Sequence, residues 1–288
     1  MLHYLLLLLS VTANVTYSSL YNHLGKTVLH DRRDAFRINM WVDLGVSVLL
    51  AGYVLLSGGE FSLYTVLLGM VFGCVTALGA VCKLKALETG PMSLTILLIT
   101  ASMVIPAFSG ALFWQEGISV WKIAGTLVMI FAGYLAAGKG EGKTSHVWLA
   151  YCIGAFLFIG SVGILQKIHQ TSPWREQKTS FLLIAFLTAA LLCAVLSRKR
   201  HEKTKPFQLN RKQWLIFGLC SICLTLNNVI NLHLSGILPS VLFFPIVNGG
   251  TTVLSVLTAL ILFREKLTKR KLAALCVALA ALSMLVFS

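Results

Sequence analysis

Residues 111–122 read ALFWQEGISVWK, and residues 260–271 read LILFREKLTKRK. At a constant separation of 149 residues, Glu116 matches Glu265 and Lys122 matches Lys271. After each stretch, small residues recur at a spacing of four, which places them on one face of a helix. Such faces let helices approach closely in lipid. The repeat predicts two related halves, residues 1–139 and residues 147–288, within one membrane domain.

The composition around this repeat is that of a membrane protein. Of the 288 residues, 57% are hydrophobic and 12% are charged, about half the charged fraction of a soluble domain. A helix needs roughly 20 apolar residues to cross a bilayer. We therefore expect an all-α integral membrane fold of ten transmembrane helices. The predicted spans are 2–20, 38–57, 64–84, 92–113, 120–138, 147–167, 179–196, 214–234, 240–262 and 271–287.

Each predicted half holds five helices, and an odd number inverts the second half relative to the first. Inverted five-helix repeats are typical of secondary transporters, whose solute site lies between the two copies. Of the 24 Lys and Arg residues, 20 lie in or beside the loops that follow odd-numbered helices. The positive-inside rule places those loops in the cytoplasm and both termini outside. The formal charge of +14 thus reports orientation, and we expect no nucleic acid partner.

The repeated junction also resembles a known family. Trp114-Gln-Glu116-Gly-Ile-Ser119 and Phe263-Arg-Glu265-Lys-Leu-Thr268 are similar to a motif of the drug/metabolite transporter superfamily, in its EamA branch. The segments 86–93 and 238–240 look like two further helix junctions of that family. The resemblance implies a ten-helix permease that works by alternating access in the bacterial plasma (inner) membrane. Family members are drawn with both termini inside, whereas the charge distribution here favours the opposite orientation.

Polar residues inside predicted spans are the candidate solute ligands, because hydrocarbon cannot satisfy them. Amide side chains offer donors and an acceptor without a charge. The alternative is that these residues join helices through hydrogen bonds, worth about 0.6 kcal/mol each on average. The predicted substrate-binding residues are Asn14, Tyr17, Ser102, Asn227, Asn228, Asn231 and Asn248.

Two spans contain residues that interrupt a helix. Proline removes a backbone donor, and adjacent glycines loosen the helix beyond it. The predicted hinge residues are Pro106 in the fourth span and Pro245, Gly249 and Gly250 in the ninth. Carboxylates are scarce at mid-span: Asp43 is expected near one end of its helix, and Glu116 and Glu265 are expected to fix helix junctions.

The sequence therefore predicts a secondary transporter that moves a small polar metabolite. The alternative is a flippase or another lipid-interacting membrane protein of the same superfamily. An enzyme is not expected, since no metal-ligand set, catalytic triad or phosphate loop is present, and no metal or cofactor is predicted. The expected partners are a small polar solute, membrane lipid and, through the small-residue faces, a second copy in a homodimer.

Overall fold

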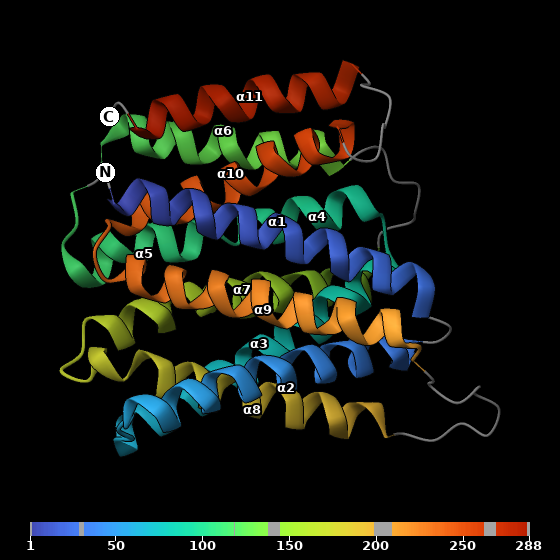
Figure 1. The fold of residues 1–288 in the computed structure, drawn as a ribbon. Helices are drawn as coiled ribbons and strands as arrows, with labels where there is room; N and C mark the ends of the chain where they lie inside the picture. Colours follow the sequence, from blue (N-terminus) through green and yellow to red (C-terminus); the bar gives the residue numbers. More distant parts are fainter. Residues whose placement is uncertain are drawn as a thin grey trace. The chain divides into compact units, whose positions relative to one another are not determined.

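The computed structural model describes residues 2–28, 32–117, 119–137, 145–198, 209–261 and 269–286, and all regular structure in those ranges is helical (Figure 1). The α-helices are α1 (Leu2–Val28), α2 (Arg32–Ser57), α3 (Leu63–Thr89), α4 (Met92–Ala101), α5 (Val104–Trp114), α6 (Val120–Ala137), α7 (His146–Gln170), α8 (Lys178–Ser197), α9 (Arg211–Ser235), α10 (Ser240–Ile261) and α11 (Lys269–Val286). A short 3-10 helix, η1 (Arg175–Gln177), precedes α8.

Each predicted span falls on helix in the described residues, but α1 extends to Val28 instead of 20, α2 begins at Arg32 instead of 38, and the predicted fourth span is divided into α4 and α5. In the described part of the chain, seven helical segments are long and apolar enough to cross a membrane. Three shorter apolar stretches lie in α6, α10 and α11. The chain is a helical membrane protein. The second copy of the repeated motif, including Glu265, lies outside the described residues.

The chain forms two compact units, and each takes helices from both predicted halves. Unit 1 comprises Met1–Val11, Leu78–Ile168 and Leu234–Ser288, and unit 2 comprises Thr12–Ala77 and His169–His233. The boundaries between the units fall inside α1, after Val11, and inside α3, after Ala77, so each of these helices contributes residues to both units.

In unit 1, α6 and α11 pack along each other. Their contact is a core of small and flexible side chains, in which Met129 and Ala132 meet Ala278 and Ala281. A side chain at Gly125 would come within 2.9 Å of Leu285. The small-residue faces predicted on these two helices therefore pack together, with α10 against both helices.

In unit 2, α2 and α8 pack along each other. Helix α3 also approaches α8 closely, because a side chain at Gly73 would come within 2.8 Å of Thr188. A separate buried cluster joins α1, α2 and α9 through Leu24, Ile38 and Phe217.

Candidate functional site

The interruption between α4 and α5 is the main irregularity of unit 1. Proline has no N–H to donate to the carbonyl of Ser102, four residues earlier, and its ring would collide with that carbonyl in a regular helix. The Ser102 carbonyl instead accepts from the backbone N–H of Ile105 at 3.1 Å, and the backbone N–H groups of Ser102 and Met103 also bond three residues back. Pro106 thus explains the break, and the predicted site residue Ser102 lies at it.

Two glycines of α7 lie against this break. A side chain at Gly160 would come within 2.9 Å of the Ser102 carbonyl oxygen. At Gly163 it would come within 2.6 Å of Cβ of Pro106 and within 2.7 Å of the Phe244 ring of α10. The interrupted helix, α7 and α10 therefore meet at positions where only glycine fits.

Helix α10 continues unbroken through its proline, from Ser240 to Ile261. The exposed Asn248 donates from its side-chain amide to the Phe244 carbonyl at 2.8 Å. Gly249 is buried against Met129, and a side chain at Gly250 would come within 3.2 Å of Val11. Both glycines allow close packing of α10 against its neighbours. Their role as hinges, in which α10 would bend during transport, stays a prediction.

A largely buried ion pair also lies in unit 1, between Glu116 and Lys167. The other carboxylate oxygen of Glu116 accepts from the backbone N–H of Ser240 at 2.7 Å. Ser240 is the first residue of α10, so the carboxylate satisfies a free donor at the positive end of that helix. The missing side chain of Gly110 leaves the space that this carboxylate occupies. Glu116 fixes a helix junction, as predicted.

Lys167 lies within α7, near the end of the helix, and its side chain is only 6% exposed. Its ammonium group also lies 5.5 Å from the ring centre of Trp114. The sequence contained no signal for this ion pair, because the two partners are 51 residues apart.

The amide residues of α9 belong to unit 2. Asn231 donates from its side-chain amide to the side-chain oxygen of Asn227 at 3.3 Å. Asn228 donates to the Leu224 carbonyl of its own helix at 2.9 Å. Asn227 is buried, whereas Asn228 and Asn231 are half-buried. These amides thus have partners within the helix, and Asn227 and Asn231 share one face as their spacing predicts.

Asn14 and Tyr17 lie on the part of α1 that belongs to unit 2, and both are half-buried. The Tyr17 ring packs at 5.6 Å from the ring of Tyr21. The Tyr21 hydroxyl in turn donates to the side-chain oxygen of Asn39 on α2 at 2.7 Å. Ser102, Asn248 and the four predicted hinge residues lie in unit 1, and the remaining predicted site residues lie in unit 2.

Asp43 is a further candidate site residue, which the sequence analysis did not select. It was expected near a helix end, but α2 begins at Arg32, so Asp43 is the twelfth of its 26 residues. Its carboxylate is close enough to Tyr17, Tyr21 and Cys193 to interact with them electrostatically. Among the described residues it has no hydrogen-bond donor and no cationic partner. A carboxylate inside a membrane helix usually marks a functional site. A span that began at Arg32 instead of 38 would have placed Asp43 well inside the helix and made it a candidate.

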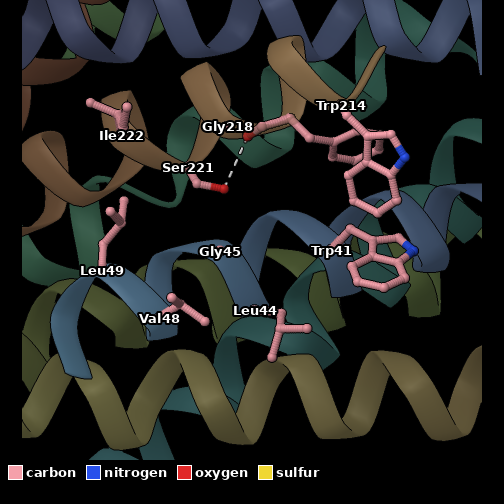
Figure 2. Close-up of a pocket in the computed structure, with 10 residues that line it drawn as sticks. Trp41, Leu44, Gly45, Val48, Leu49, Trp214, Gly218, Ser221 and Ile222 are labelled. Atoms are coloured by element: carbon pink, nitrogen blue, oxygen red, sulfur yellow. Dashed lines mark hydrogen bonds between the residues drawn. The ribbon is translucent and has the colours of Figure 1, made fainter. Parts of the chain in front are cut away.

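An apolar cavity of about 370 Å³ lies in unit 2 between α2 and α9 (Figure 2). Trp41 and Trp214 meet edge to face at one end, with ring centres 5.0 Å apart. A side chain at Gly45 would come within 2.9 Å of Cβ of Ser221, so the two helices approach closely there. This space is referred to below as the α2–α9 groove.

Comparisons with known proteins support the fold alone. No protein family model matches the chain, and no curated protein matches it in sequence. Solved structures do match it in fold, 28 chains in all. One of them, described only as the crystal structure of a protein, superposes with a TM-score of 0.74 at 13% identity. That match covers 98% of this chain and 96% of the other, so the whole chain follows a known helical architecture.

Proposed function

We propose that this protein is a secondary transporter that moves a small polar metabolite by alternating access between two inverted repeats. The observation that carries the proposal is the interrupted fourth helix, α4–α5, packed against the proline-containing ninth helix, α10. Hydrophobic segments that contain proline or glycine at corresponding positions of two halves are a sequence pointer to the solute site of such transporters; here the segment of the first half is interrupted, and that of the second half carries Pro245 in a continuous helix. The backbone at the break departs from a regular helix beside the buried Ser102, and irregular backbone is tolerated at membrane depth only inside protein or along a cavity.

The pairing of helices supports the repeat. Helices α2 and α8 are the second and seventh of the ten proposed spans, and α6 and α11 are the fifth and tenth. Each of these two pairs packs closely within one unit. A pseudo-twofold axis relating two five-helix halves would bring such equivalent helices together. In the proposal, α4 and α5 together cross the membrane as one span. The resemblance of the repeated motif to the EamA branch is the reason for placing the protein in the bacterial inner membrane.

The test is thermal unfolding of the purified full-length protein against amino acids, sugars, nucleosides and phosphorylated metabolites. A ligand at 100 times its dissociation constant stabilises the native state by about 2.7 kcal/mol, which corresponds to a rise of roughly 5–10 °C in Tm. We expect at least one polar compound to give such a rise, and the same compound to be transported into proteoliposomes.

A matched pair of variants sharpens this test. Asn248→Ala should abolish the stabilisation by the compound, because it removes an exposed amide close to the proline of α10. Thr258→Ala, further along the same helix, removes only a hydroxyl that bonds its own helix at 2.7 Å and should leave the response unchanged. If no compound stabilises the wild-type protein, or if both variants respond alike, a polar solute site at α10 is excluded.

A flippase is the second candidate, and the α2–α9 groove favours it because an apolar groove offers a lipid tail a place beside the protein. Vesicles with fluorescent phospholipid in one leaflet distinguish the two functions. A flippase would speed equilibration of the label between leaflets, whereas a metabolite transporter would leave it at the protein-free rate. Lipid movement without any solute transport would replace the first proposal by the second.

A further inference from the structure

The walls of the α2–α9 groove are two complete helical stripes (Figure 2). They consist of residues 41, 44, 45, 48 and 49 on α2 and of residues 214, 217, 218, 221 and 222 on α9. Each set has the spacing of one helix face. Trp41 meets Trp214 and Gly45 approaches Ser221, so the stripes run in the same direction. Eight residue steps make each stripe about 12 Å long.

The groove offers almost no polar group to an occupant. The Ser221 hydroxyl lies 3.0 Å from the carbonyl oxygens of both Val42 and Phe217, so its proton is already used inside the protein. The Val48 and Ile222 side chains are 64% and 45% exposed. In a membrane protein, exposed aliphatic walls of this kind are matched by hydrocarbon tails, which are as apolar as leucine.

The tryptophan end of the groove has a different character. Figure 2 shows both indole nitrogens at the end opposite Leu49 and Ile222. Tryptophans collect at the level of the lipid headgroups, where the ring lies in apolar surroundings and its N–H meets polar groups. The groove therefore has an apolar body and a donor-bearing end, as a phospholipid has an apolar tail and an acceptor-bearing headgroup.

Positive charge extends both stripes beyond the tryptophans. Arg37 lies one turn before Trp41, and Arg211 lies one turn before Trp214. Arg37 is bonded to Asp34 at 3.3 Å, whereas Arg211 and its neighbour Lys212 are exposed. Basic side chains beside a membrane attract anionic lipid headgroups.

We propose that the α2–α9 groove binds an acyl chain of an anionic phospholipid, whose phosphate is held by the indole N–H groups of Trp41 and Trp214 and by Arg211. A second copy of the chain is a poorer occupant, because a symmetric dimer brings the same patch together and would oppose two cationic ends. Binding of this lipid does not depend on what the protein transports.

The test is native mass spectrometry of the full-length protein, titrated with phosphatidylglycerol and, separately, with phosphatidylcholine of the same chain length. Gly218→Leu fills the groove without a clash, since nothing lies within 4 Å of a Cβ at that position. Gly52→Leu on α2 is the matched control, with equally open space and no part in the groove. Arg211→Gln removes the headgroup charge, and the exposed Arg175→Gln serves as its control.

We expect the wild-type protein to bind the first phosphatidylglycerol about fivefold more tightly than phosphatidylcholine. Gly218→Leu should weaken both lipids by at least about tenfold, and Arg211→Gln should abolish the preference alone. Both control variants should bind as the wild type does. Equal binding by Gly218→Leu and Gly52→Leu, or a preference that survives Arg211→Gln, would overturn the proposal. A dimer mass that Gly218→Leu alone abolishes would assign the groove to a second copy instead.

Discussion

At the scale of single residues, Glu116 and Asp43 have opposite surroundings. The Glu116 carboxylate has a cationic partner in Lys167 and a backbone donor in Ser240. The Asp43 carboxylate has no such partner among the described residues. A buried pair that loses one member leaves an uncompensated charge, whereas a buried charge without a partner costs free energy already in the native protein. The two sites should therefore respond in opposite ways when a charge is removed.

Lys167→Met should destabilise the protein strongly, by about 3–5 kcal/mol, because it leaves the Glu116 carboxylate charged and without a cationic partner. The double variant Lys167→Met/Glu116→Gln should recover most of this loss, since glutamine still accepts from the Ser240 N–H. Unfolding in denaturant measures both variants. Lys85→Met is the control, because Lys85 is a third exposed in its pair with Glu88 and should cost less than about 1 kcal/mol. Equal losses in the single and double variants would contradict the role of the ion pair.

Asp43→Asn should raise the Tm or leave it unchanged, because the amide has the shape of the carboxyl group and cannot ionise. Asp34→Asn is the same substitution in the same helix, but it breaks the pair with Arg37 and should lower the Tm. A fall in Tm for Asp43→Asn as large as that for Asp34→Asn would mean that Asp43 has a structural partner. If Asp43 instead serves transport, its variant will be stable and inactive in proteoliposomes.

At the scale of elements, the contact of α7 with the interrupted helix depends on the missing side chain of Gly163. Gly163→Leu should cost about 1–3 kcal/mol through overpacking against Pro106 and Phe244. Gly52→Leu adds the same side chain where nothing lies within 4 Å and should cost nothing. Thermal unfolding of the two variants gives the comparison, and similar Tm values would show that α7 can move away from the break.

The break itself can be removed by Pro106→Ala. Alanine keeps the Cβ that contacts α7 and restores an N–H for the Ser102 carbonyl, so α4 and α5 can join as one helix. We expect a Tm at least as high as that of the wild type, together with a loss of most solute transport. Undiminished transport in a folded Pro106→Ala variant would show that the interruption is not part of the mechanism.

At the scale of the whole molecule, the ten proposed spans predict on which side of the membrane each loop lies. Single cysteines at Ser145 and Asn210 should react with a membrane-impermeant reagent from one side, and those at Glu60 and Arg175 from the other. The charge distribution predicts that the first side is the cytoplasm. Labelling of positions 60 and 145 from the same side would mean that α4 and α5 enter and leave by one face, which would exclude the ten-span topology.

The sequence by itself was sufficient for the helices, because their cause is local. A run of about 20 apolar residues between turn residues is helical in lipid whatever its neighbours, since each backbone group must bond within its own segment. For this reason, every predicted span falls on helix wherever the structure describes it, although α1 runs to Val28, beyond its predicted end at 20, and α2 begins at Arg32, before its predicted start at 38. The role of Glu116 at a junction also followed from its repeated local motif.

Other features depended on residues far apart in the chain, and only the tertiary structure decided them. The partner of Glu116 is 51 residues away, and the hydrogen bond that joins α2 to α9 beside the groove links Ser221 to Val42, 179 residues away. Hydropathy says that a helix is buried in lipid but not which helix it touches, because every apolar face suits hydrocarbon equally well. Close contacts in the membrane depend on shape, at glycines such as Gly163 and Gly73, and shape exists only once the helices have packed.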